Sequence, residues 1–203
     1  DAMNIDVWEV IDGAATKPFG YMPFYPGPGL GGHCIPIDPY YLTWKAREYE
    51  LSTKFIVLAG EINVGMPRYV ISRLREALDA ASGNGLRDSK VLVIGIAYKK
   101  NVSDMRESPS VQLVELLLKA GALPEFHDPH VSEIPKMRAY PHLLGMKSVP
   151  FDDIPSQGYD AVLIATDHDA VDYAALEKLG LPVIDTRNAF AKRNLPMTNV
   201  TKA

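Results

Sequence analysis

The hydrophobic and polar positions of the first fifty residues predict two short helices that flank an irregular segment. Apolar residues three positions apart predict a helix over Ile5–Ala15. A second helix is predicted over Asp38–Glu50, with Asp38 as its N-cap and Pro39 in its first turn. Between them, Pro18–Pro39 contains six prolines and five glycines, half of its 22 residues, and this composition excludes regular structure over most of the segment.

The next stretch predicts one long helix, Thr53–Ala81, because apolar residues recur every four positions with Arg and Glu between them. Pro67 is expected to kink it, since proline removes a backbone hydrogen bond and clashes with the preceding turn. At about 1.5 Å per residue the helix exceeds about 40 Å, so we expect it to link two domains or to form a dimer interface. Residues 82–85 (SGNG) end it and mark the expected domain boundary. The apolar stripe consists of Ile62, Met66, Val70, Leu74 and Leu78.

From residue 86 the pattern changes to alternating strands and helices. The predicted strands are continuous apolar runs, so the expected fold is α/β with a doubly wound parallel sheet. The ligand crevice of such a sheet lies at the carboxyl ends of its strands. Arg138–Asp153 has no clear pattern and is expected to be loop. The predicted strands are Lys90–Ile96, Leu123–His127, Ala161–Ala165 and Val183–Asp185, and the predicted helices are Ser110–Ala120 and Tyr173–Leu179. The polar residues at the strand ends are Tyr98, Lys99, Lys100, Asp128, Thr166, Asp167, His168 and Arg187.

Composition and charge exclude several classes of protein. Hydrophobic residues make up 47% and charged residues 23% of the chain, which is typical of a folded globular protein rather than a disordered or collagen-like one. The net charge of -4 offers no basic surface for nucleic acid. No apolar run reaches the roughly 18–20 residues of a membrane helix. One cysteine allows no internal disulfide and no cysteine-based metal cluster, so no metal is expected and a reducing, cytoplasmic location is indicated.

The segment that carries candidate chemistry is the glycine-rich loop and the residues after it. Without Cβ atoms, the loop backbone can approach a phosphate or a sugar closely. Cys34 follows the loop close to the predicted start of a helix, where the helix dipole favours a thiolate. Asp38 comes four residues later, and in a helix-like turn its carboxylate faces the same side as the sulfur. That spacing suits a base that positions water to hydrolyse an acyl-enzyme.

Other interpretations of this segment stay open on the residues alone. A lone cysteine such as Cys34 is more often a small buried hydrophobic residue than a nucleophile. His33, directly before it, could act as a competing base, although a histidine beside a glycine turn is as often a surface residue.

Two motifs carry a resemblance to a known family. GPGLGGHCIPIDPYYL at residues 27–42 and GIAYKKNVSDMRESPS at residues 95–110 resemble UDP-glucose/GDP-mannose dehydrogenases. The resemblance is closest to the branch that oxidises UDP-N-acetylhexosamines, whose members carry GGHCIPxDP. It implies a central helical dimerisation segment at residues 1–82, with the glycine-rich loop and a catalytic cysteine. It also implies a C-terminal Rossmann-like domain at residues 86–203 that binds the UDP-sugar.

The resemblance further implies NAD-dependent, four-electron oxidation of the sugar C6 alcohol to a carboxylate. Separately, we expect a homodimer through helix 53–81, because its apolar stripe is longer than one small domain can cover. Cys34 is then the nucleophile of a thiohemiacetal and a thioester, Asp38 assists the hydrolytic water, and Arg106 contacts NAD. The arginine also has an ordinary explanation, which is local pairing with Asp104 or Glu107 at a helix start. The implied substrate contacts are Tyr25, Gly27, Gly29, Lys99 and Arg187.

The chain departs from the family in one large respect. No GxGxxG-type fingerprint follows a strand, and only Gly95 follows the first one. We therefore expect the family's NAD domain to lie outside this chain, and we expect these residues alone not to turn over substrate. Two alternatives are a non-catalytic nucleotide-sugar-binding or dimerisation module, and a thiol hydrolase that pairs Cys34 with a distant histidine.

Overall fold

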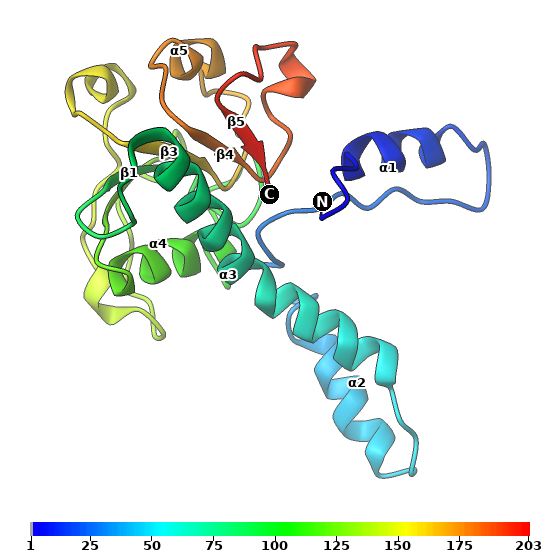
Figure 1. Ribbon diagram of the computed structural model, residues 1–203. Coiled ribbons are helices and arrows are strands. Elements are labelled where there is room, and N and C mark those ends of the chain that lie inside the picture. Colours follow the sequence, from blue (N-terminus) through cyan, green and yellow to red (C-terminus); the bar gives the residue numbers. More distant parts are fainter. Residues whose placement is uncertain (1) are drawn as a thin grey trace.

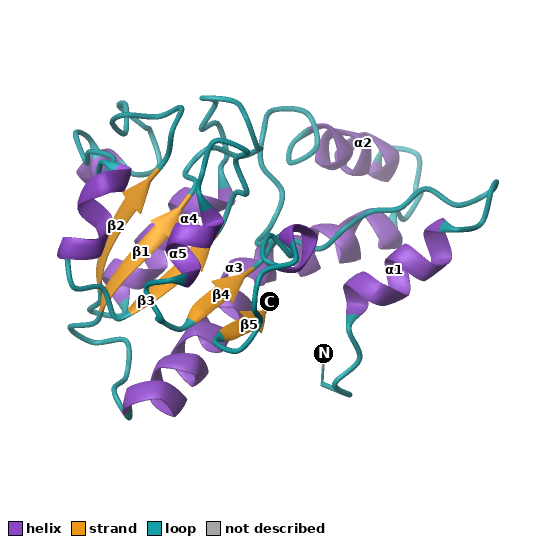
Figure 2. Ribbon diagram, turned by 90° about the horizontal axis from the view of Figure 1, so that it is seen from above, coloured by secondary structure: helices purple, strands orange, loops and turns teal. Residues whose placement is uncertain are grey.

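The computed structural model describes residues 2–203. Figures 1 and 2 show a parallel sheet with helices packed on it and a helical extension that projects away from it. Within residues 2–203, no helix combines the length and the hydropathy that crossing a membrane requires. The helices are α1 (Val7–Ala15), α2 (Asp38–Arg47), α3 (Lys54–Ser82), α4 (Pro109–Lys119) and α5 (Tyr173–Glu177). The strands are β1 (Lys90–Ile94), β2 (Leu123–His127), β3 (Ala161–Ile164), β4 (Val183–Asp185) and β5 (Val200–Lys202).

The sheet is parallel throughout and has helices on both faces. Its strand order is β2-β1-β3-β4-β5, and every neighbouring pair runs parallel. Alternate residues of β1 point to opposite faces: Val91 and Val93 pack with α3 and α4, whereas Leu92 and Ile94 pack with α5. The prediction of a doubly wound α/β fold is confirmed.

The sequence pattern misses β5 and extends β1 too far. β5 has only three residues and they are all half-buried, so it lacks the apolar run of the other strands. β1 ends two residues earlier than predicted, because Gly95 adopts a φ of +80° that a strand cannot continue through. The segment expected to be loop, Arg138–Asp153, contains the short 3-10 helix Pro141–Leu143 and the beginning of another at Phe151.

The long helix α3 has a buried half and an exposed half. Val70, Leu74 and Leu78 are at most 1% exposed and pack in one core with α4 and the sheet. In the N-terminal half, Phe55 is 89% exposed and Ile62 is 57% exposed. Figure 1 shows this half extending beyond the sheet beside α2. Only the N-terminal half of the apolar stripe is therefore accessible to a partner.

Pro67 lies inside α3 without ending it, because the helix is continuous from Lys54 to Ser82. Proline cannot donate the backbone hydrogen bond that the carbonyl of Asn63 would receive in a regular helix. A Cβ on Gly29 would lie 3.4 Å from this carbonyl oxygen and 3.8 Å from the Pro67 ring. The proline therefore marks the point where the glycine-rich loop crosses α3.

Substitution of Gly95 by alanine is expected to destabilise the protein by about 3 kcal/mol. Gly95 has a φ of +80°, and a Cβ there would lie 2.3 Å from the carbonyl oxygen of Thr166, a backbone atom with little freedom to move. Urea unfolding measures the loss. Gly85→Ala is the matched control, since nothing lies within 4 Å of its Cβ position. Equal stability of the two variants would contradict this expectation.

Candidate functional site

The glycine loop, residues 27–32, packs directly on the carboxyl edge of the sheet. A Cβ on Gly27 would lie 2.4 Å from Nη1 of Arg187, and a Cβ on Gly31 would lie 2.6 Å from Cβ of Tyr98. The sequence suggested that these glycines open the backbone to a ligand. In the structure they also open it to side chains of the same chain, which brings the loop against two residues of the second predicted domain.

Cys34 follows the glycine loop on an exposed turn. The N–H of Asp38 donates to the carbonyl of Cys34 at 2.8 Å, the hydrogen bond of one helical turn, and α2 begins at Asp38. The prediction that Asp38 caps this helix is wrong, because Ile37 occupies the N-cap and Asp38 is the first helical residue. The thiol and the carboxylate are both in exposed residues one turn apart, so a group bound over this turn can meet both.

A cavity of about 880 Å³, which we call the cysteine-side cavity, lies beside this turn. One of its walls is formed by Gly32 and His33, which precede Cys34, and by Ile37, three residues after it. The other walls come from the loop before α4 and from the segment after β2. Its lining includes Gly32, His33, Ile37, residues 103–108 and most of residues 130–140.

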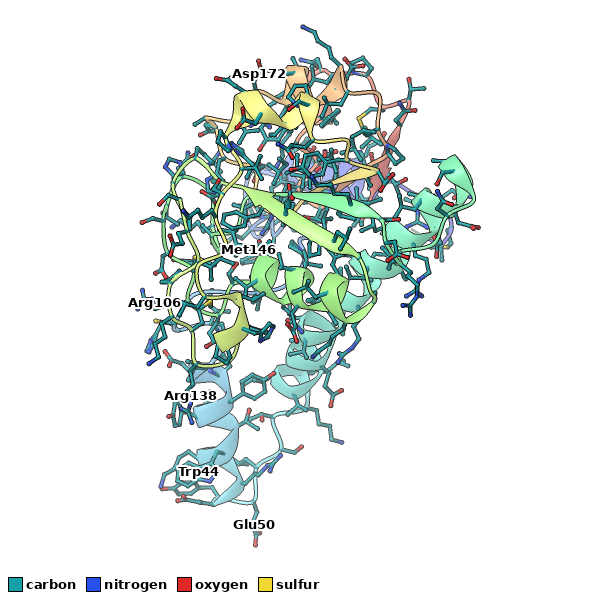
Figure 3. All side chains as sticks on the ribbon, turned by 90° about the vertical axis from the view of Figure 1, so that its left-hand side faces the viewer. Trp44, Glu50, Arg106, Arg138, Met146 and Asp172 are labelled. Atoms are coloured by element: carbon teal, nitrogen blue, oxygen red, sulfur yellow. The ribbon has the colours of Figure 1, made fainter. Side chains whose placement is uncertain are left out.

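Arg106 is exposed and lines the cysteine-side cavity. Its Nη2 lies 2.6 Å from Oδ2 of Asp104, and its Nε contacts both oxygens of that carboxylate. These hydrogen bonds raise the pKa of Arg106. The N–H of Gly32 donates to the Arg106 carbonyl at 2.9 Å, which joins its backbone to the loop that leads into Cys34. Figure 3 shows Arg106 on the same side of the molecule as Arg138, another residue of the cavity wall.

A second cavity, of about 470 Å³, shares no lining residue with the first and surrounds Arg187; we call it the arginine cavity. Nε of Arg187 donates to the carbonyl of Ala165 at 2.8 Å, at the end of β3. Burial lowers the pKa of Arg187, and the charges of Asp167 and Asp185 oppose this decrease. The cavity brings four cations together with two carboxylates. Its lining is Trp8, Tyr25, Pro26, Lys100, Asp167, Asp169, Arg187, Lys192 and Arg193.

Tyr25 reaches the arginine cavity as part of an aromatic stack. Its ring lies on Trp8 with centroids 5.2 Å apart and planes 14° apart, and its hydroxyl donates to Asp12 at 2.7 Å. Nζ of Lys192 lies 4.7 Å from the Trp8 centroid and 5.7 Å from the Tyr25 centroid, which allows cation–π attraction to both rings. Sequence reasoning missed Trp8 and Lys192, because no local pattern connects residues at opposite ends of a chain.

Three predicted contacts, Gly27, Gly29 and Lys99, line neither of these cavities, although Gly27 packs against Arg187. Lys99 is exposed, forms no hydrogen bond or ion pair with any other of residues 2–203, and lines neither cavity. Its neighbour Lys100 does line the arginine cavity and lies 2.8 Å from Asp169. Gly29 packs beside Pro109 and lines a third cavity, of about 470 Å³, bordered by α2 and α3.

Comparisons with known proteins identify the family of this chain. The UDP-binding domain of the UDP-glucose/GDP-mannose dehydrogenase family matches residues 92–192, and the central domain of that family matches residues 1–64. The chain belongs to the UDP-glucose/GDP-mannose dehydrogenase family. The resemblance inferred from the two motifs is confirmed.

Several similar proteins are named as nucleotide-sugar dehydrogenases. A UDP-N-acetyl-D-mannosamine dehydrogenase of Methanococcus maripaludis is 36% identical over 169 residues, which are 83% of this chain and 35% of that protein. A UDP-N-acetyl-D-glucosamine 6-dehydrogenase of Pseudomonas aeruginosa is 35% identical over 82% of this chain and 37% of its own length. The structure of a UDP-D-ManNAc dehydrogenase from Pyrococcus horikoshii matches with a TM-score of 0.78 at 29% identity, over 99% of this chain and 44% of the other. The chain thus spans less than half of these relatives.

In this member of the family, the loop after β1 does not present a dinucleotide phosphate site. The backbone N–H groups of Ile96 and Ala97 donate to Oδ2 of Asp128 at 2.7 and 3.2 Å. Because these amides already bond a buried carboxylate, they do not face a ligand phosphate. Gly95 packs against Thr166 rather than opening toward a ligand. The part of the chain that the structure describes therefore does not cradle dinucleotide phosphates after β1.

Asp128 itself carries a lowered pKa. Burial acts to raise it, but hydrogen bonds from His168 and from the backbone N–H of His130 lower the pKa of Asp128 below 3.8. Together with Thr166, these strand-end residues were expected at a ligand crevice. Asp128, Thr166 and His168 are instead at most 4% exposed and bonded to the protein.

Asp128→Asn is expected to destabilise the protein by about 2–4 kcal/mol at pH 7, because the amide cannot accept all the hydrogen bonds of the carboxylate. The folded-state pKa is depressed, so ionised Asp128 contributes its full stability above pH 3.8 and loses it as the pH falls through the lower folded value. Urea unfolding at pH 7 and pH 3 should show a smaller difference between wild type and variant at pH 3. The exposed Asp152→Asn is the control, and a difference that stays constant with pH would refute the argument.

Proposed function

We propose that this chain is the catalytic-cysteine and substrate-binding portion of an NAD-dependent nucleotide-sugar 6-dehydrogenase. The observation that carries the proposal is the course of the glycine loop. It leads from Gly27, which packs on the guanidinium of Arg187, to the exposed turn of Cys34. A nucleotide sugar has an anionic diphosphate for the arginine and a sugar carbon for the thiol. Family membership and the activities for which the relatives are named support the same reaction class.

The arginine cavity is the proposed site of the UDP group. The guanidinium of Arg187 is planar and donates in a fixed geometry that matches phosphate. Tyr25 lines the cavity and Gly27 lies against the arginine. Lys99 and Gly29 are proposed as further substrate contacts, on the basis of the family motifs. The named relatives favour a UDP-N-acetylhexosamine as the substrate, with UDP-glucose as the alternative.

Cys34 and Asp38 are the proposed catalytic residues. Oxidation of the C6 alcohol yields an aldehyde, to whose carbon the Cys34 thiol adds to form a thiohemiacetal. A second oxidation converts this adduct to a thioester, and water then cleaves the C–S bond to release the carboxylate and restore the thiol. Asp38, one helical turn away, accepts a proton from the attacking water.

Arg106 is the residue of this chain proposed to face NAD, from the wall of the cysteine-side cavity. NAD, when bound, accepts one hydride in each of the two oxidation steps. Most of its binding is assigned to a domain outside residues 1–203, because the loop after β1 is closed by Asp128. We divide the chain into a central helical segment, residues 1–82, and a UDP-sugar-binding domain, residues 86–203. The matches to residues 1–64 and 92–192 support this division. A working thiol at Cys34 fits a reducing cytoplasm.

A UDP-N-acetylhexosamine is expected to slow alkylation of Cys34 by iodoacetamide at least about tenfold at saturation, because it covers the thiol. Arg187→Met should raise the ligand concentration needed for protection about 10–100-fold, by removing a charge-assisted phosphate contact. Arg87→Met, an arginine beside Gly121 and outside the arginine cavity, should leave it unchanged. Mass spectrometry measures the labelling.

The outcomes separate the proposal from its alternative. Failure of any UDP-sugar to bind or to protect would contradict the proposed function. Calorimetric binding without protection of Cys34 would favour a nucleotide-sugar-binding module without catalysis.

We also propose that the chain forms a homodimer through the exposed half of α3. Phe55 and Ile62 on α3 and Trp44 on α2 are each at least 57% exposed, which is an unusual concentration of apolar surface. Light scattering at micromolar concentration is expected to give twice the mass of one chain. The double variant Phe55→Asp/Ile62→Asp should be monomeric, whereas Leu144→Asp, at a residue 57% exposed on another surface, should stay dimeric. A monomeric wild type would refute the proposal.

A further inference from the structure

The loop of residues 98–101, which carries Lys99 and Lys100, is fastened to the loop after β3. The side-chain amide of Asn101 donates to Asp169 at 2.6 Å, and the backbone N–H of Asp169 donates back to Oδ1 of Asn101 at 3.0 Å. Asn101 has a φ of +61°, in the left-handed region that asparagine adopts more readily than most other residues. The two hydrogen bonds between Asn101 and Asp169 therefore hold the loop that carries the two lysines.

His168 supplies the third and most buried part of the attachment. The backbone N–H of Asn101 donates to Nδ1 of His168 at 2.9 Å. Because Nδ1 accepts, the proton of the neutral ring is on Nε2, which donates to Oδ2 of Asp128 at 3.0 Å. The His168 side chain is completely buried. One imidazole thus connects a core carboxylate on one side with the lysine-bearing loop on the other.

The two sides of the ring serve different parts of the molecule. The Nε2 side belongs to the carboxylate network that closes the sheet edge, since Asp128 also accepts from the loops after β1 and β2. The Nδ1 side leads outward to Asn101. Lys100 and Asp169, which this attachment brings to 2.8 Å from each other, both line the arginine cavity. Loss of the hydrogen bond at Nδ1 is therefore expected to affect Lys100 and Asp169 in the wall of that cavity.

We propose that His168 is a positioning residue for nucleotide-sugar binding, which holds loop 98–101 so that Lys100 lines the arginine cavity. The inference rests on the proposed function, because it assigns this cation to the bound diphosphate. His168 itself touches no substrate. Its contribution is to reduce the motion of a lysine that would otherwise have to be ordered when the ligand binds.

Two substitutions separate the two hydrogen bonds of the ring. In His168→Gln, the amide nitrogen can reach the position of Nε2 and donate to Asp128, but nothing accepts from Asn101. In His168→Asn, the amide oxygen lies near the position of Nδ1 and can accept from Asn101, but the bond to Asp128 is lost. A purely structural role predicts that binding follows stability in both variants. A positioning role predicts that the two effects separate.

The measurements are the Kd for UDP by calorimetry and the free energy of unfolding in urea. His168→Gln is expected to bind UDP about tenfold more weakly than wild type while being the more stable of the two variants. His168→Asn is expected to be the less stable variant but to bind within about threefold of wild type. The loss of affinity in Lys100→Met should overlap with the loss in His168→Gln, so the double variant binds more tightly than the sum of the two effects predicts.

Each outcome decides a separate point. Absence of UDP binding by wild type would refute the proposed function. If wild type binds and Lys100→Met weakens binding while His168→Gln does not, the positioning role is wrong and the proposed function stands. If neither His168 variant folds, hydrogen exchange of the wild-type Asn101 N–H, the donor to Nδ1 of His168, decides instead. This N–H is expected to be protected from exchange, and exchange as fast as that of an unfolded chain would overturn the inference.

Discussion

The buried carboxylate of Asp128 is the interaction on which the carboxyl edge of the sheet depends. An ionised group in a protein interior is stable only when hydrogen bonds replace its water. Asp128 accepts these hydrogen bonds from three loops, so the conformation of each loop depends on the same carboxylate. Asp185 repeats the arrangement at the end of β4, where it accepts from the N–H groups of Arg187 and Phe190 at 3.0 Å. The donors to Asp128 are the backbone N–H groups of Ile96, Ala97, His130 and Val131 and the ring of His168.

This edge supports the glycine loop and separates two kinds of surface. The loop needs glycines because Arg187 and Tyr98 occupy the space that Cβ atoms would take. Its close packing places the Cys34 turn beside one cavity and Arg187 within another. The proposed function assigns the diphosphate of the substrate to the arginine cavity and the sugar carbon to the Cys34 turn. The same carboxylate that shapes the edge accepts the hydrogen bonds of the amides after β1, so these amides do not face a ligand phosphate.

Local pattern predicted those elements whose stability depends on their own residues. The spacing of apolar residues located α3 to within one residue at each end, and the apolar runs located β2 and β4 at their observed bounds. It failed for β5, a short, half-buried strand whose position depends on pairing with β4. It also failed for Asp38, which it placed at an N-cap, because the helical turn starts earlier, at the carbonyl of Cys34.

For this protein, the sequence by itself determined the α/β class, the order of the main elements and the motif that contains Cys34 and Asp38. Each of these depends on residues within a few positions of one another. Tertiary structure alone decided that Trp8 and Tyr25 meet Lys192, that Gly27 lies on Arg187, and that Asp128 and His168 are buried bonding groups rather than ligand contacts. The physical reason is that burial and hydrogen-bond partners come from residues distant in sequence, and one unaligned chain carries no periodic signal of such pairs.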